Sequence, residues 1–100
     1  MKFGLSDEDI NKINNILKEY PIEKAIIFGS RAKGNYKDGS DIDLAILADI
    51  KFKELLEIKV RYDELFIPYK LDIIDYKKIK SKELKEHIKR VGKVFYAKSI

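Results

Sequence analysis

The sequence predicts an α/β fold of the α+β kind, in which a small mixed β-sheet is flanked by helices, within a single domain over residues 1–100. Apolar side chains repeat at helical spacing in three long stretches, near both ends and in the middle of the chain. Three shorter runs rich in Ile and Leu are bounded by Gly, Pro, Asn or Asp, as strands are. The resulting order is helix, strand, strand, helix, strand, helix.

A first helix is predicted over residues 5–20. Ser6 is a suitable N-cap, and Asp9 three residues later can complete a capping box, in which Glu or Gln is the usual partner. The acidic residues 7–9 suit the positive end of a helix dipole. Apolar residues recur at helical spacing at Ile10, Ile13, Ile16 and Leu17, and Pro21 ends the helix.

Two predicted strands follow, over residues 22–28 and 41–47. Gly29 stops the first strand, because glycine disfavours continued strand structure. Residues 31–40 are rich in Gly, Asn and Asp, so we expect a loop or one short helical turn there. The two strands are expected to pair like a hairpin across this loop.

The second half of the chain is predicted to supply a helix, a strand and another helix. Residues 51–66 form a helix that Pro68 ends, and residues 69–76 return to the sheet as a third strand after this helical crossover. Ser81 is the candidate N-cap of a last helix over residues 81–96. The end of this segment, residues 94–97, is compatible with either a strand or a helix end.

Composition narrows the function classes. With no Cys and one His, the chain excludes a disulfide framework and a Cys-based zinc site and disfavours a transition-metal site. No apolar run has the length of a membrane span and residues 1–10 lack a secretory pattern, so we expect a cytoplasmic protein with no membrane contact. The basic segment 77–93 suits an acidic partner or a polyphosphate, although a solvated helix face that includes His87 is the simpler interpretation.

Two carboxylates, Asp41 and Asp43, stand in the second predicted strand, where Asp is uncommon. Side chains alternate along a strand, so both point to one face of the sheet, whereas Asp72 and Asp75 of the third strand point to opposite faces. Like charges this close repel, and a divalent cation that takes oxygen ligands removes the conflict. The alternative is that Asp41 caps a turn and Asp43 lies on an exposed sheet edge.

Gly29 and Ser30, at the end of the first predicted strand, favour the metal interpretation. A glycine at a strand end lets the backbone approach a ligand closely, and a helical turn that begins at Ser30 would present its amides to an anion. Arg31 or Lys33 can add positive charge. An anion site beside a carboxylate pair is what metal-assisted phosphoryl or nucleotidyl transfer needs.

Residues 29–44, GSRAKGNYKDGSDIDL, resemble the signature of the DNA polymerase beta-like nucleotidyltransferases, in which Gly-Ser is followed by Asp-x-Asp about ten residues later. More narrowly, they are similar to the minimal nucleotidyltransferase (MNT) antitoxins, whose pattern is G-S-x-A-R-G-x-Y-x-x-x-S-D-x-D-L. Lys33 is the one departure, because the pattern has Arg there, and Lys offers phosphate a point charge rather than a planar fork. The likeness extends through the segment LDIID to the closing IKRVGKVFY.

This resemblance implies the polymerase beta-like nucleotidyltransferase fold and an Mg²⁺-dependent transfer of AMP from ATP. Asp41, Asp43 and Asp72 would be the catalytic carboxylates and the ligands of two Mg²⁺ ions, with Asp72 also the base for the acceptor hydroxyl. The groups that bind the nucleotide phosphates would be Gly29, Ser30, Arg31, Lys33 and Ser40. Asp75 would replace Asp72 if the strand register were shifted by an odd step.

The acceptor implied by the resemblance is a tyrosine of a cognate HEPN-domain ribonuclease toxin, which binds its antitoxin and is inactivated by AMP. A nucleotidyltransferase that acts on a small-molecule hydroxyl, or a binding-only antitoxin, is the alternative; the first usually carries a further substrate domain, and the second has no need of a costly charge cluster. Direct nucleic-acid binding is not expected, because segment 77–93 lacks interleaved aromatic platforms. Tyr36, in the motif loop, is left open between base stacking, a partner contact and packing of the loop.

Overall fold

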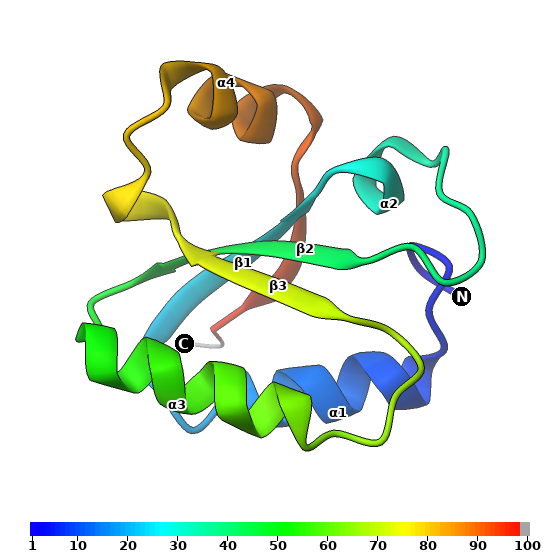
Figure 1. The fold of residues 1–100 in the computed structure, drawn as a ribbon, viewed down its shortest axis with the longest axis horizontal. Coiled ribbons are helices and arrows are strands. Elements are labelled where there is room, and N and C mark those ends of the chain that lie inside the picture. Colours follow the sequence, from blue (N-terminus) through cyan, green and yellow to red (C-terminus); the bar gives the residue numbers. More distant parts are fainter. Residues whose placement is uncertain (99–100) are drawn as a thin grey trace.

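The computed structural model, which describes residues 1–98, contains one four-stranded sheet with helices on both faces (Figure 1). The helices are α1 (Asp7–Leu17), α2 (Ser30–Lys33), α3 (Phe52–Asp63) and α4 (Lys82–Val91), with a 3₁₀ turn, η1 (Tyr76–Lys78). The strands are β1 (Ile22–Phe28), β2 (Ile42–Ala48), β3 (Leu71–Asp75) and β4 (Lys93–Ala97). The predicted fold class is confirmed. None of the helices within residues 1–98 has the length and apolar character needed to cross a membrane.

The sheet is mixed, with the strand order β3-β2-β1-β4. Strands β1 and β2 pair antiparallel, as expected of a hairpin-like pair, and β3 pairs parallel to β2 after the crossover through α3. Strand β4 pairs antiparallel to β1 on its other side, so the segment that the sequence left open between strand and helix end is a fourth strand. The two central strands therefore each have a neighbour on both sides.

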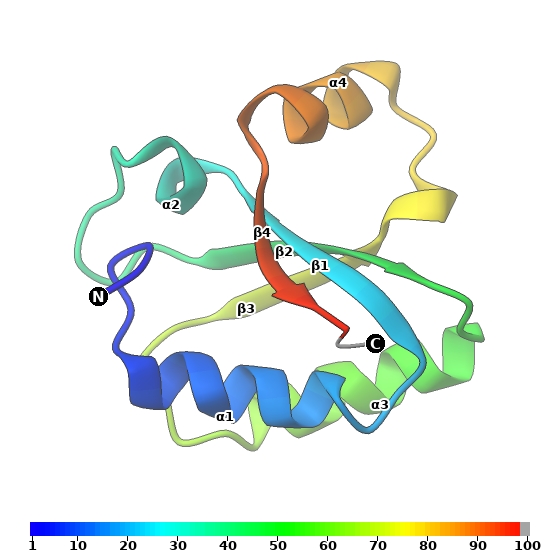
Figure 2. The same ribbon diagram turned by 180° about the vertical axis from the view of Figure 1, so that it is seen from behind.

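One face of the sheet carries the main apolar core. Figures 1 and 2 show α1 and α3 side by side across this face. The largest fully buried side chains are Leu5, Ile13, Leu17, Ile22, Ile27, Ile42, Leu44, Ile46, Ile58 and Ile73. In β2 the buried residues Ile42, Leu44 and Ile46 alternate along the strand, so the residues between them face the other side of the sheet.

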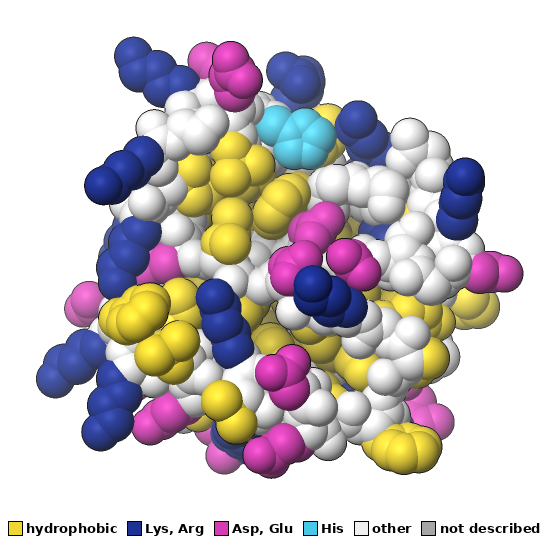
Figure 3. Space-filling model, viewed as in Figure 1, with side chains coloured by type: hydrophobic (Ala, Val, Ile, Leu, Met, Phe, Trp, Pro, Cys, Tyr) yellow, Lys and Arg dark blue, Asp and Glu magenta, His cyan; other side chains and the backbone are white. Residues whose placement is uncertain are grey.

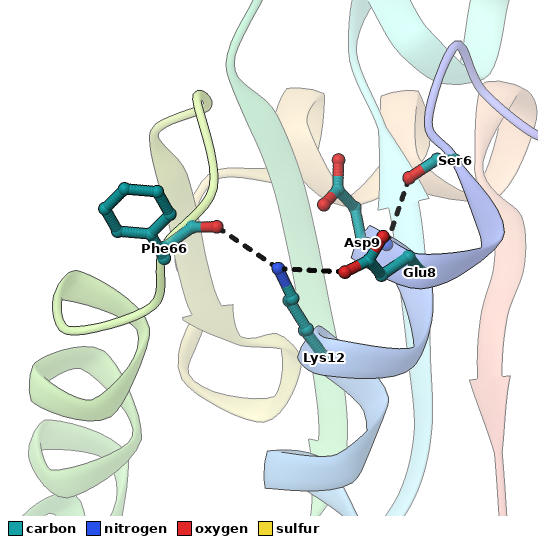
Figure 4. Close-up of polar contacts among 5 residues, drawn as sticks. All are labelled: Ser6, Glu8, Asp9, Lys12 and Phe66. Atoms are coloured by element: carbon teal, nitrogen blue, oxygen red, sulfur yellow. Dashed lines mark hydrogen bonds and ion pairs between the residues drawn. The ribbon is translucent and has the colours of Figure 1, made fainter.

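The start of α1 is fixed by the N-cap expected from the sequence. The Oγ atom of Ser6 accepts a hydrogen bond from the backbone N–H of Asp9 at 3.1 Å (Figure 4). One turn later, the Nζ atom of Lys12 lies 3.6 Å from the Glu8 carboxylate and donates to the carbonyl oxygen of Phe66 at 3.4 Å. Helix α1 is thereby tied to the segment that leads from α3 to β3.

Helix α4 covers part of the opposite face (Figure 1). Ile88 is buried on its inner side, and the ring of His87 lies edge-on to the ring of Phe28, with the centroids 6.3 Å apart. The expectation that His87 belongs to the solvated side of this helix holds only in part, because the ring packs against Phe28 but stays partly exposed. Its place at the border of the packed side follows from spacing, because His87 lies three residues after Leu84, which is also half-buried.

The packing of α3 predicts that two neighbouring truncations have very different effects on the free energy of unfolding. Ile58→Ala removes a fully buried side chain and should lower the free energy of unfolding by about 2–5 kcal/mol. Val60→Ala, two residues along the same helix, shortens a side chain that is 56% exposed and should change it by less than about 0.5 kcal/mol. Urea unfolding followed by circular dichroism measures both, and equal losses would mean that the inner side of α3 is misassigned.

Candidate active site

Asp41 and Asp43 lie at the start of β2, on the face opposite the main core. Asp41 immediately precedes the strand and is exposed, whereas Asp43, the second residue of the strand, is half-buried. Ile42 and Leu44, on either side of Asp43, are fully buried on the other face. The alternation expected from the sequence is confirmed for Asp43 within β2, and Asp41, one residue before the strand, lies near enough to contribute to the raised pKa of Asp43.

Asp72 lies beside Asp43 across the parallel pair of β2 and β3. The register pairs Asp43 with Asp72, so their side chains leave the same face of the sheet. Asp75 pairs with Ile46, is buried, and accepts a hydrogen bond from the backbone N–H of Lys77 at 3.0 Å. The register therefore places Asp72 with the carboxylate pair, and Asp75 has a structural role as the cap of η1.

The three carboxylates act on one another electrostatically. The pKa of Asp43 is raised above its ordinary value, first by burial and then by the negative charges of Asp72 and Asp41. The direction of this shift shows that Asp41 and Asp72 lie near enough to Asp43 to act on its charge, an effect that reaches further than the coordination shell of one cation. Hard oxygen donors of this kind fit Mg²⁺ and do not fit a metal that prefers sulfur or nitrogen.

The carboxylates do not by themselves enclose an ion. Within residues 1–98, no group of three or more His, Cys, Asp or Glu side chains is gathered tightly enough to hold a metal alone. Mg²⁺ commonly takes one or two carboxylates and completes its coordination with water and substrate phosphates. The donor set therefore fits a cation that arrives together with a polyphosphate.

Gly29 joins β1 to α2 directly beside Asp43. Its φ of +74° lies in a region that side chains rarely adopt, and a Cβ atom built there would stand 2.6 Å from the Oδ2 atom of Asp43. Only glycine lets the backbone pass this close to the carboxylate. The first turn of α2 begins at Ser30, where backbone N–H groups have no partner within the helix, so the junction can bind an anion next to the carboxylates.

Arg31 does not occupy the phosphate-binding place expected from the sequence. The side chain is 3% exposed, and it donates from Nε (3.1 Å) and Nη2 (2.8 Å) to the carbonyl oxygen of Ser40 and from Nη1 (2.8 Å) to that of Phe3. Its guanidinium carbon lies 5.1 Å from the ring centroid of Tyr36 and 4.7 Å from that of Tyr69. Arg31 therefore fixes the loop over residues 34–41 by hydrogen bonds to backbone carbonyl groups, and Tyr36 packs against its guanidinium group.

Ser40 also serves the loop. Its Oγ atom accepts a hydrogen bond from the backbone N–H of Lys37 at 2.9 Å, and its carbonyl oxygen holds Arg31. Lys33, the last residue of α2, is exposed. Of the positive and polar side chains expected to contact phosphate, Arg31 and Ser40 hold the loop, whereas the exposed Lys33 is still open to an anion.

Comparison with known proteins shows which family this chain is similar to. Residues 11–100 match the family described as Polymerase beta, Nucleotidyltransferase. The Haemophilus influenzae protein named "Probable protein adenylyltransferase MntA" is 29% identical over 100 residues, which cover 97% of this chain and 87% of the relative.

Solved structures share the fold. A toxin–antitoxin crystal structure with AMP-PNP superposes with a TM-score of 0.72 at 23% identity and covers 90% of this chain and 74% of its own. A tri-AMPylated Shewanella oneidensis HEPN toxin in complex with an MNT antitoxin gives a TM-score of 0.69 at 20% identity, covering 94% and 74%. At these identities the likeness shows the fold.

The raised pKa of Asp43 predicts a pH-dependent gain of stability in Asp43→Asn. An acid whose pKa is raised on folding stabilises the folded state while it is protonated, and this contribution is lost as the pH rises from the unfolded value of 3.8 through the folded pKa. Asn resembles the protonated acid, so the variant should match the wild type at low pH. At neutral pH, without metal, it should be more stable by less than about 1 kcal/mol, because water screens this half-exposed group.

Thermal unfolding of both proteins between acid and neutral pH measures this difference. Asp49→Asn, which removes an exposed carboxylate beyond the other end of β2, is the matched control and should show no such rise. A variant that is less stable than the wild type at neutral pH would show that Asp43 is held by favourable contacts rather than strained by its neighbours.

Proposed function

The chain belongs to the polymerase beta nucleotidyltransferase family, and from this premise we propose that it is an antitoxin that transfers AMP from ATP to a tyrosine of a HEPN-domain toxin. The observation that carries the proposal is the row of carboxylates on one sheet face, with Asp43 paired to Asp72 and abutting Gly29. The acceptor is suggested by the relative named as a protein adenylyltransferase and by the fold neighbour whose HEPN toxin is AMPylated. The cytoplasm is the proposed compartment.

In the proposed reaction, Asp41, Asp43 and Asp72 would hold Mg²⁺, with two ions as the expected number. Bound Mg²⁺ would supply the positive charge that draws carboxylates and phosphates together and offsets the charge developing at the α-phosphate. The backbone N–H groups after Gly29, together with Ser30, bind the phosphates on the side away from the carboxylates. The exposed Lys33 adds charge at the end of α2.

Asp72 is proposed as the group that takes the proton from the acceptor. A tyrosine hydroxyl has a pKa near 10 and is a weak nucleophile at neutral pH. As Asp72 removes the proton, the tyrosine oxygen forms a bond to the α-phosphorus, the bond from that phosphorus to the bridging oxygen breaks, and pyrophosphate leaves. Asp72 suits this role because it is exposed at the edge strand β3, where a large acceptor has access.

The glycine at the phosphate junction should be essential for nucleotide binding. Gly29→Ala places a methyl group against the Asp43 carboxylate and should weaken binding of AMP-PNP with Mg²⁺ by about tenfold or more. Gly34→Ala is the matched control, because Gly34 has a similar φ of +88° at the other end of α2 and no atom within 4 Å of a Cβ. Gly34→Ala should lose about 1–2 kcal/mol of stability to left-handed backbone strain. Gly29→Ala should lose more, because its φ of +74° and ψ of −154° lie in a region that is essentially restricted to glycine.

Calorimetric titration of the folded proteins separates affinity from stability, because only Gly29→Ala should lose affinity for AMP-PNP although both variants carry a strained backbone. Equal affinities for the two variants would remove the phosphate junction from the binding site and leave α2 with a structural role alone.

Asp72→Asn should separate binding from transfer. It keeps the size of the side chain but removes its basicity, so AMP-PNP binding through Asp41 and Asp43 should be largely retained while transfer slows roughly 10²–10⁴-fold. The measurement is intact-mass spectrometry of a cognate HEPN-domain toxin incubated with the variant, ATP and Mg²⁺. Addition of AMP at the wild-type rate by Asp72→Asn would exclude Asp72 as the base, and no addition by the wild-type protein would refute the proposed activity.

A further inference from the structure

Phe28, on β1, continues the row formed by Asp72 and Asp43 across one more strand. Asp43 pairs with Asp72 on β3 and with Phe28 on β1, so the side chains of all three leave the same sheet face in a line that crosses three adjacent strands. Side chains directly opposite in an antiparallel pair have Cβ atoms about 4.5–5.5 Å apart. The ring of Phe28 is therefore the immediate neighbour of Asp43 on the side away from Asp72.

The ring of His87 covers Phe28 from α4. The two rings meet edge-on at 84° with their centroids 6.3 Å apart, and both residues are only partly buried. On this face of the molecule, Figure 3 shows hydrophobic side chains (yellow) beside the histidine (cyan), with acidic side chains (magenta) nearby. We refer to Phe28 and His87 as the ring pair. It borders the acidic row and keeps exposed area that the core does not use.

In the proposed reaction, the order of the side chains on β3, β2 and β1 leaves the side of Asp43 toward β1 for the nucleoside. The phosphates are held between Gly29 and the carboxylates, and the acceptor hydroxyl must reach Asp72 at the edge strand. An acceptor over β3 and a nucleoside in the same place would exclude each other. The opposite side of Asp43, over β1, carries two partly exposed aromatic rings at 84° to each other, and a nucleobase can stack on the open face of one of them.

We propose that the ring pair is the surface on which the nucleotide base lies. This inference rests on the proposed function, because it concerns the same nucleotide, but it assigns a role that the phosphate and metal groups do not fill. Stacking on aromatic rings tolerates any base, so His87 and Phe28 contribute affinity for nucleoside triphosphates in general.

The single histidine allows a direct test in the untagged protein. AMP-PNP and inorganic tripolyphosphate, each with Mg²⁺, share the phosphate chemistry, but only the first carries a base. In proton NMR, the imidazole resonance of His87 should move on titration with AMP-PNP and stay in place with tripolyphosphate. Movement of equal size with both ligands would overturn the base contact while leaving the proposed function intact, because it would report phosphate binding alone.

Variants at position 87 provide an independent measurement by calorimetry. His87→Ala should bind AMP-PNP roughly 5- to 100-fold more weakly, the range expected for loss of one stacking contact. His87→Phe keeps a ring and should retain most of the affinity, and both should bind tripolyphosphate as the wild type does. Glu86→Gln, an exposed neighbour on α4, is the matched control and should bind both ligands within about twofold of wild type.

Unchanged AMP-PNP affinity in His87→Ala, or equal losses in His87→Ala and His87→Phe, would overturn the stacking role of the ring pair. Failure of the wild-type protein to bind either ligand with Mg²⁺ would overturn this inference and the proposed function together. The two proposals are thus told apart by the tripolyphosphate measurement, which depends on the metal and phosphate groups only.

Discussion

The repulsion among Asp41, Asp43 and Asp72 is the constraint to which the rest of the site is fitted. The sheet register places Asp72 opposite Asp43, whose pKa is raised first by its own burial and then by the charges of Asp72 and Asp41. Apart from any ligand, this arrangement opposes folding. It is retained by a fold whose stability comes from the other face of the sheet, where α1 and α3 bury a continuous apolar core.

Two features hold the carboxylates in spite of this repulsion. Gly29 lets the backbone lie against the Asp43 carboxylate, which a side chain would displace. Arg31 holds the carbonyl oxygen of Ser40, the residue that precedes Asp41, and is itself stacked between Tyr36 and Tyr69. Because a guanidinium offers several N–H groups in one plane, Arg31 can join the start of β2 to the N-terminal segment at Phe3.

The features that the sequence predicts correctly depend on local periodicity. Alternation along β2 places Asp41 and Asp43 on one face, and the glycine after β1 marks the junction with α2, so the heart of the site follows from neighbouring residues. Arg31 is different, because its burial depends on Tyr69, far along the chain, and on Phe3. A cation beside a glycine-rich turn has the same local pattern whether it meets phosphate or two backbone carbonyls. His87 did carry a signal, since it lies three residues after Leu84, a spacing at which two side chains are neighbours on a helix surface.

The strand order explains how three side chains of one small sheet come to lie in a row on the same face. In the order β3-β2-β1, Asp72 stands at an open edge, Asp43 in the centre and Phe28 beyond it, under α4. The parallel pair with β3 requires the crossover through α3, which packs on the core face and leaves the face above Asp72 uncovered. A hairpin connection from β2 to β3 would reverse the strand and could pair Asp43 with a different residue. The crossover thus contributes both to the core and to the register that brings the second and third carboxylates together.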